Sequence, residues 1–149
     1  RIRMELETWD DFGRAGKEMV VARTLDTGAP VTGGLETDDV DPRMVDGRGI
    51  PIAAARSHVL QATARTEGEK MFRRGYSFDD GPTTDGLPDA GLLFAAYQAD
   101  IATAFVPVQA RLAESDLLNE WITHIGSATF AVPRGARPGE FIGQGLLGT

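Results

Sequence analysis

The sequence contains no cysteine, and this absence excludes whole classes of chemistry. Disulfides, thiolate catalysis, iron–sulfur clusters and cysteine-rich zinc sites all require a sulfur atom that the chain does not have. Histidine is almost as scarce, because His58 and His124 are the only two in 149 residues. Any metal chemistry must therefore rest on these two side chains, on carboxylates, or on a cofactor that brings its own ligands.

Positive charge is also in short supply. The chain has 15 Lys and Arg against 22 Asp and Glu, for a net charge of -7. Nucleic-acid binding needs clustered cations, so we expect no nucleic-acid partner. No apolar run reaches the length of a membrane span, and no secretory leader pattern opens the sequence, so no membrane span is expected. A hydrophobic content of 42% is enough for one globular domain over residues 1–149.

The first half of the chain changes character at about residue 24. Alternating apolar and charged residues from Ile2 to Leu6 predict a strand with one buried face. Thr8 and Asp11 resemble a capping box, which predicts a helix that continues to about Arg23. Residues 24–55 are rich in Gly, Pro and acidic side chains and show no periodicity, so they predict a long irregular loop.

The second half alternates strand and helix patterns. The expected strands are one near Met71–Tyr76, a buried one at Leu92–Tyr97 and a last one at Ser127–Val132, with a turn at "DDGPTTDGLPDAG" between the first two. A helix is expected at about Ile101–Ala113, and Pro107 should delay its start or kink it. A second helix is expected at Leu117–Ile125, with Asp116 as its N-cap. This order predicts an α+β, ferredoxin-like antiparallel sheet with helices packed on one face.

The stretch "RSHVLQATARTEGEKMFRRGYSF" places His58 fifteen positions before Arg73, the first of two adjacent arginines. A lone histidine is most often a surface residue or a satisfied core residue, and His124 has the same ordinary explanation. The whole stretch, however, resembles the haem-binding segment of the dye-decolourising peroxidases. Further segments match that family in order: "RIRMELETWD", "GKEMVVAR", "GAP", "GLLFAAYQAD", "FVPVQARLAESDLLNEWITHIGSATFAVP" and "GQGLLG". The resemblance covers nearly the whole chain except for residues 31–55.

The resemblance implies a haem peroxidase that uses haem b (iron protoporphyrin IX) and hydrogen peroxide to oxidise bulky aromatic or dye-like donors. His58 would be the proximal ligand to iron, and Arg73 the distal arginine that stabilises negative charge on the departing oxygen. Leu92 and Phe94 match apolar residues of the distal pocket. Arg74 points to the other side of a strand and is read as a structural arginine.

Two further residues are candidates with competing explanations. Asp100 could accept the second ring N–H of the iron-ligating histidine, or it could cap the helix that follows it. Arg65 could bind a haem propionate, or it could be a solvated loop residue. The chain departs from the family at Leu60, where arginine is common, and at Ala64, where proline is expected.

The family's catalytic aspartate lies in a Gly-x-x-Asp-Gly motif that belongs to an N-terminal half. Asp85 has different spacing and reads as a turn residue, so we expect an N-terminal half or a partner chain to supply that aspartate. Family resemblance also predicts an exported bacterial protein, periplasmic or extracellular, and leaves homo-oligomers open. Two alternatives stand: a haem-binding or haem-handling domain without peroxidase turnover, and a cofactor-free α+β dimeric module.

Overall fold

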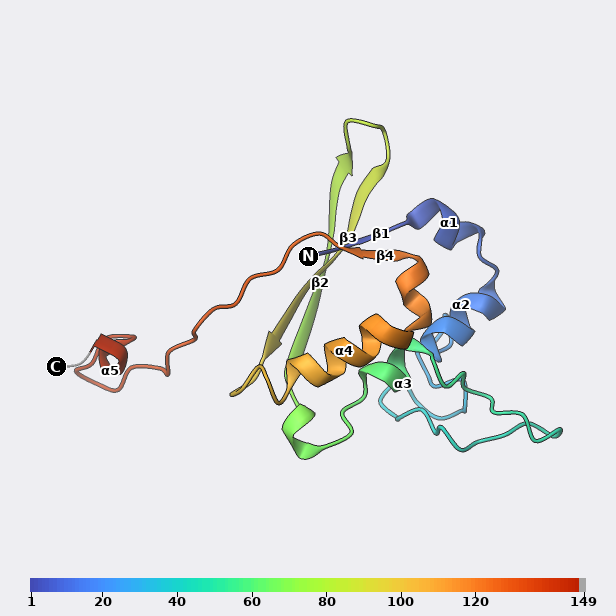
Figure 1. Ribbon diagram of the computed structural model, residues 1–149, viewed down its shortest axis with the longest axis horizontal. Helices are drawn as coiled ribbons and strands as arrows, with labels where there is room; N and C mark the ends of the chain where they lie inside the picture. The colour runs from blue at the N-terminus through green and yellow to red at the C-terminus, as the bar shows by residue number, and fades with distance from the viewer. Residues whose placement is uncertain (148–149) are drawn as a thin grey trace.

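A four-stranded antiparallel sheet organises the computed structural model, which describes residues 1–147 (Figure 1). Its strands are β1 (Ile2–Met4), β2 (Phe72–Pro82), β3 (Pro88–Tyr97) and β4 (Ile122–His124). The helical elements are α1 (Leu6–Asp11), α2 (Arg14–Val21), α3 (His58–Ala62), the 3₁₀ turn η1 (Glu67–Glu69), α4 (Phe105–Ser115), the 3₁₀ turn η2 (Leu117–Glu120) and α5 (Gln144–Leu147).

The spatial strand order is β2-β3-β1-β4, with the first strand between the third and the last. Helices separate β1 from β2, and α4 separates β3 from β4, so the chain follows the β-α-β-β-α-β plan. The predicted α+β, ferredoxin-like fold is confirmed.

β2 and β3 form the longest hairpin of the sheet, and they pair in register from Phe72 opposite Tyr97 to Asp79 opposite Ala90. Their alternating and apolar patterns are long enough to predict both strands, although the observed strands extend further toward the turn than predicted. β1 packs against β3 at Gly91, where any Cβ atom would collide with the carbonyl oxygen of Ile2. Gly91 thus permits the close approach that brings β1 into the sheet.

The predicted helix from Thr8 to Arg23 is instead two short helices. α1 already begins at Leu6, so Thr8 lies inside it and its hydroxyl donates back to the carbonyl of Glu5 rather than capping a helix start. The chain is extended at Phe12, and α2 starts after Gly13. The break lets Phe12 and Trp9 pack against Trp121 next to the sheet.

Two predictions near the C-terminus are wrong. Asp116 does cap the following segment, because its carboxylate accepts from the backbone N–H of Leu118, but that segment is only the single turn η2. The chain then enters β4, which pairs with β1 where a helix was expected. Residues 127–132 form neither strand nor helix in the described chain, because β4 already occupies the edge of the sheet beside β1.

A small core anchors α3 at the side of the sheet. Ala22, Val40 and Ala53 are buried together, and Val59 and Leu60 of α3 pack against them. The irregular stretch before α3 is held by Arg23, whose guanidinium donates to the carbonyls of Gly28, Glu36 and Asp38. This region therefore fixes the site-bearing helix without any regular element of its own between Val21 and His58.

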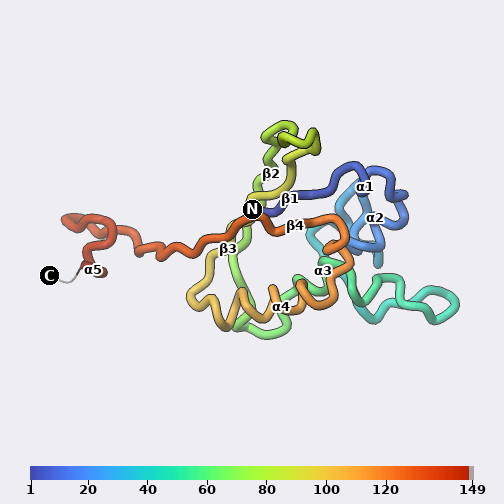
Figure 2. Tube along the Cα trace, turned by 45° about the horizontal axis from the view of Figure 1, so that its top comes forward, coloured from blue at the N-terminus to red at the C-terminus, as the bar shows by residue number. Residues whose placement is uncertain are grey.

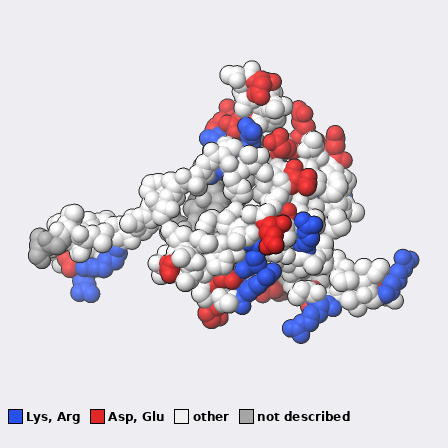
Figure 3. All heavy atoms as spheres, in the orientation of Figure 1, with Lys and Arg blue, Asp and Glu red and all other residues white. Residues whose placement is uncertain are grey.

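The chain after β4 runs away from the sheet as an extended arm that ends in α5, as the two ribbon views agree (Figures 1 and 2). Acidic side chains gather at the tip of the β2–β3 hairpin, whereas the arm is mostly uncharged on the face shown in Figure 3. In the described residues, no helix is long and apolar enough to cross a membrane.

Candidate functional site

His58 is the first residue of α3, a helix of five residues that packs against α4. Its backbone position is fixed by Val59 and Leu60, which are inserted into the small core. About a third of the His58 side chain is exposed, so the ring is held at one edge and accessible at the other.

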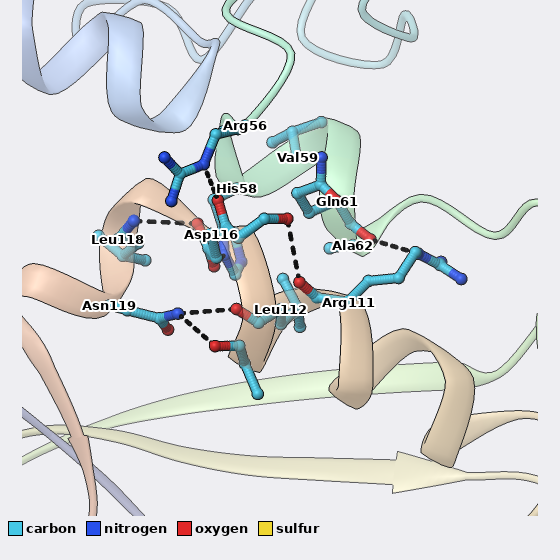
Figure 4. A network of polar contacts seen from close by, with 12 residues as sticks. Arg56, His58, Val59, Gln61, Ala62, Arg111, Leu112, Asp116, Leu118 and Asn119 are labelled. Atoms are coloured by element: carbon cyan, nitrogen blue, oxygen red, sulfur yellow. Dashed lines mark hydrogen bonds and ion pairs between the residues drawn. The ribbon is translucent and has the colours of Figure 1, made fainter.

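One nitrogen of the His58 ring is bonded to a buried carboxylate. The Nδ1 atom donates to Oδ2 of Asp116 at 2.6 Å, and the Asp116 side chain is 1% exposed (Figure 4). An ionised carboxylate can only accept, so the proton of a neutral ring lies on Nδ1. The Nε2 atom is then an unprotonated nitrogen with a lone pair, which is the form that binds a metal.

Asp116 has two separate bonds, one for each carboxylate oxygen. While Oδ2 accepts from His58, Oδ1 accepts from the backbone N–H of Leu118 at 2.9 Å. The second bond holds the carboxylate in place at the start of η2, so the ring orientation of His58 is set by a capped turn 58 residues further along the chain.

Asp100 does not accept from His58, which corrects the prediction made for it. Its Oδ1 atom accepts from the backbone N–H of Ala102, and its carbonyl accepts from the backbone N–H of Ala104. The competing explanation, in which Asp100 organises the turn that leads into α4, is the one observed. α4 itself begins late, at Phe105, which leaves Pro107 in its first turn where no intrahelical donor is needed.

Three predicted residues share one face of the β2–β3 hairpin. Arg73 lies opposite Ala96, and Leu92 and Phe94 lie opposite Ser77 and Gly75 on the paired strand. Residues directly opposite one another, and residues two apart, point to the same side of a sheet. Arg73 reaches the C-terminal end of α3, where its guanidinium donates to the carbonyl of Ala62 at 3.2 Å. This face therefore looks toward the helix that carries His58.

Gly75 keeps this face open. A Cβ atom at this position would lie 3.1 Å from Cδ1 of Leu92, so any side chain would press on the apolar surface beside Arg73. Phe94 remains 38% exposed on the same face. The result is an apolar surface with the cationic side chain of Arg73 at its border.

Arg74 lies on the opposite face, as predicted for the structural arginine of the pair. Its guanidinium stacks 4.0 Å from the ring centroid of Phe72, which lies two residues earlier on the same side of β2. The two neighbouring arginines thus serve different surfaces of the sheet.

Arg65 lies in a second polar network, below the C-terminal end of α3. Its guanidinium contacts the side-chain oxygen of Gln61 at 3.4 Å, and its backbone N–H donates to Glu69. Arg111 of α4 also donates to Glu69, and this bond, followed by that from the Arg65 backbone, lowers the pKa of the Glu69 carboxyl. Binding of a haem propionate by Arg65 stays a prediction.

Asp85 lies in the turn between β2 and β3 and accepts from the hydroxyl of Thr83, which lowers its pKa. It is a turn residue, as expected. His124 lies in β4 opposite Ile2 and is exposed. Neither residue has a side-chain hydrogen bond to α3 in the described part of the chain, so neither is placed in this site.

No group of three or more His, Asp or Glu side chains suited to a metal ion occurs among the residues that the structure describes. A metal held by His58 would have to bring further ligands with it, as a macrocycle does. A hollow in the described part of the chain lies elsewhere, in the curled end, and is lined by residues between Ala131 and Leu146. Leu92 and Phe94 lie on the hairpin face that carries Arg73, and Arg73 reaches the C-terminal end of the helix that begins at His58.

Comparison with known proteins gives this surface a family context. The sequence model described as Dyp-type peroxidase, C-terminal, matches residues 1–137. The chain belongs to the Dyp-type peroxidase family. A dye-decolorizing peroxidase of Thermobifida fusca (strain YX) is 49% identical over 149 residues, with 99% of this chain and 34% of that protein covered. A deferrochelatase of Escherichia coli O6:K15:H31 is 36% identical over 150 residues, with 98% and 35% covered.

Solved structures agree with the family assignment. The DyP-type peroxidase of Cellulomonas bogoriensis superposes with a TM-score of 0.94 at 45% identity, covering 99% of this chain and 41% of that one. Ferric DtpA of Streptomyces lividans gives a TM-score of 0.91 at 41% identity, covering 99% and 41%. This member of the Dyp-type family therefore spans about a third of the length of the curated relatives it matches.

Proposed function

We propose that this chain is the haem-binding part of a dye-decolourising peroxidase, with His58 as the proximal ligand to the iron of haem b. The observation that carries the proposal is the hydrogen bond from His58 Nδ1 to the buried carboxylate of Asp116. It orients the ring, fixes the proton on Nδ1 and makes Nε2 a more basic ligand. A carboxylate behind an iron-bound imidazole raises its electron donation, which favours the oxidised states that a peroxidase uses.

The residues present fit haem better than they fit a bare metal ion. The Nε2 atom of His58 has no hydrogen bond among the described residues, Leu92 and Phe94 share a sheet face with Arg73, and Arg73 contacts the end of the helix that carries His58. Haem itself supplies four equatorial ligands, so a single histidine suffices to hold its iron. Arg65 is the candidate for a propionate, because a guanidinium binds a carboxylate with two donors.

Bound haem would supply the iron that reacts with hydrogen peroxide, and the peroxide would supply the oxidising equivalents that are passed to bulky aromatic or dye-like donors. Arg73 would stabilise negative charge that develops on peroxide oxygen, because its guanidinium is permanently charged and already placed at the border of the site. Leu92 and Phe94 would exclude water from the same surface, which strengthens that electrostatic interaction.

The remainder of the catalytic site would come from outside these 149 residues. The relatives are about three times as long as the matched region, so we propose that an N-terminal half or a partner chain carries the aspartate that transfers protons with Arg73. Export, and assembly into homo-oligomers, stay predictions from the family resemblance.

Titration of the purified chain with ferric haem tests the proposal. We expect a shift of the Soret band with saturation in the wild type, and loss of the histidine-ligated spectrum in His58→Ala. The matched control is His124→Ala, which removes the other histidine from an exposed strand and should bind as the wild type does. An unshifted Soret band, or an unchanged one in His58→Ala, would contradict the proposal and favour a cofactor-free α+β module.

Haem handling without peroxidase turnover is the second candidate function. It is favoured by the relatives named deferrochelatase, which match at 33–36% identity. The two candidates share haem binding and differ afterwards, so the haem-loaded chain should be mixed rapidly with hydrogen peroxide. Formation of an oxidised haem spectrum that aromatic donors return to the resting state supports the peroxidase, whereas loss of iron or release of haem supports the second candidate.

A further inference from the structure

The helix that carries His58 is too short to hold its own position. α3 has five residues, whereas isolated helices below about 12–15 residues are marginal in water. Its orientation, and with it the direction of the free His58 nitrogen, must therefore be set by contacts with other elements. Val59 and Leu60 pack against the small core, and hydrogen bonds at both ends of α3 come from α4 and the turn that follows it.

The N-terminal end of α3 is tied to the end of α4. The Arg56 guanidinium donates to the carbonyl of Ser115 at 2.9 Å, and the backbone N–H of Leu117 donates to the carbonyl of Arg56 at 3.0 Å. Next to these bonds lies the bond from His58 to Asp116. Three bonds thus fix this end of α3 within a single turn of chain.

The C-terminal end of α3 is tied to α4 by Arg111 alone. Its Nε donates to the carbonyl of Gln61 at 3.3 Å (Figure 4). Its Nη2 donates to the carbonyl of Thr63 at 3.0 Å. The same Nη2 contacts Glu69 at 2.9 Å, and both side chains of this pair are nearly buried, at 14% and 9% exposed. The last carbonyls of a helix have no partner within it, so a guanidinium here replaces the missing donors.

The two ties lie one turn apart on α4. Arg111 and Ser115 are four residues apart, so they lie on the same face, and the Ser115 hydroxyl donates to the Arg111 carbonyl at 3.2 Å. A rotation or shift of α3 against α4 would have to break both ties together. α4 therefore acts as a rigid support along which α3 is held at each end.

We propose that Arg111 is a positioning residue for the haem site, which acts through α3 to set the direction of His58 Nε2. The inference rests on the proposed function, because that direction matters only when a ligand is bound there. Arg111 also bonds the carbonyls of Gln61 and Thr63, which flank Ala62, and the Ala62 carbonyl accepts from Arg73. These bonds, which we call the Arg111 brace, thus also align the carbonyl that accepts from the distal arginine. If Arg111 formed only a structural ion pair, its removal would lower stability without altering the direction of His58 Nε2 or the position of the Ala62 carbonyl.

The test compares Arg111→Met with Arg111→Lys, which keeps the charge but loses the planar pair of donors. The matched control is Arg14→Met, because Arg14 also forms ion pairs, with Glu18 and Asp26, but lies on a helix that carries no site residue. The first readout uses the protein without haem: hydrogen exchange at the Gln61 and Thr63 amides and the ¹⁵N signals of the His58 ring. Both amides are bonded within or next to α3.

In Arg111→Met we expect these amides to exchange at least about tenfold faster, because bonds to a charged group are the stronger class. The His58 Nδ1–H signal should broaden or exchange away, Arg111→Lys should be intermediate, and Arg14→Met should match the wild type. With ferric haem added, Arg111→Met should bind about tenfold more weakly and show more than one axial-ligand species by electron paramagnetic resonance.

A lower melting temperature in Arg111→Met with unchanged His58 signals and a single axial species would overturn the proposal. If Arg111→Met does not fold, Glu69→Gln decides the matter, because it weakens the Arg111 brace while leaving both carbonyl bonds available. It should shift the same signals in the same direction by a smaller amount, and unchanged signals would refute the inference. Failure of the wild type to bind haem would instead refute the proposed function. The measurements on the haem-free protein would still test whether Arg111 positions α3 and His58.

Discussion

Replacement of Asp116 by asparagine tests the centre of the site, because the two oxygens of Asp116 have different partners. Oδ1 accepts from the backbone of Leu118, and Oδ2 accepts from His58. Asparagine has one acceptor and one donor group. If its oxygen keeps the bond to Leu118, its NH₂ faces the His58 ring and favours the tautomer with the proton on Nε2, which cannot ligate iron.

The expected loss follows from the burial of the pair. A hydrogen bond to a charged group contributes about 1.5–3 kcal/mol. His58 is about a third exposed while Asp116 is buried, so the lower end of that range applies. That value corresponds to about tenfold weaker binding of ferric haem, and the loss of a neighbouring carboxylate behind a metal-bound histidine is typically about 10–100-fold.

The redox potential gives an independent measurement. The carboxylate stabilises ferric iron more than ferrous iron, so its removal should raise the Fe(III)/Fe(II) potential. A tenfold difference between the two affinities corresponds to about 60 mV for one electron. Spectroelectrochemical titration of the haem-loaded wild type and Asp116→Asn would record the shift, and ¹⁵N spectra of the haem-free proteins would record the tautomer.

Asp100→Asn is the matched control, since Asp100 was the residue that the sequence suggested for this role and the structure places it on the Ala102 backbone. It should leave both the affinity and the potential unchanged. Equal affinity and potential in Asp116→Asn and the wild type, or a larger effect from Asp100→Asn, would refute the reasoning.

Three further substitutions test other parts of the structure. Arg73→Leu should slow the reaction of the haem-loaded chain with hydrogen peroxide by about a hundredfold in stopped-flow experiments, whereas Arg74→Leu, on the opposite face, should not; equal rates would contradict the facing assignment. Gly91→Ala should lower stability by about 1–3 kcal/mol in denaturant unfolding, because its Cβ would collide with the Ile2 carbonyl, and an unchanged midpoint would mean that β1 does not pair as described. The pKa of Glu69 is lowered in the fold, so its contribution to stability is present above the ordinary value of 4.5 and disappears as pH falls through the folded pKa. Thermal unfolding of the wild type and Glu69→Gln should therefore differ at neutral pH and converge in acid, and a gap that persists in acid would exclude this linkage.

Local patterns predicted those elements whose partners lie nearby in the chain. The β2–β3 hairpin was predictable because its two strands are joined by plain turn chemistry and pair with each other. β4 was not, because the apolar spacing between Leu117 and Ile125 also suits a helix. Only its pairing with β1, at the other end of the chain, makes it a strand.

The site divides in the same way. His58, Arg73, Leu92 and Phe94 were predicted from contiguous motifs, and their roles stay predictions. The choice between Asp100 and Asp116 could not be predicted in this way, since both are aspartates at the start of a turn or helix and both predicted a capping role. What separates them is that α4 packs against α3, which brings its C-terminal end to His58 and leaves its N-terminal end away. No pattern around either aspartate carries that information.

The two sides of the site differ in how firmly they are held. On the His58 side, a short helix is bonded at both ends to α4, and the carboxylate behind the ring is buried and capped. On the other side, Arg73 extends from an exposed strand, and among the described residues its guanidinium donates only to the carbonyl of Ala62. Substitutions on the His58 side should therefore act mainly on the affinity and electronic state of a bound haem. Substitutions at Arg73 should act mainly on the rate at which that haem reacts with peroxide. If substitutions on both sides altered affinity and rate in constant proportion, the site would have to respond as one unit, and this separation of roles would be wrong.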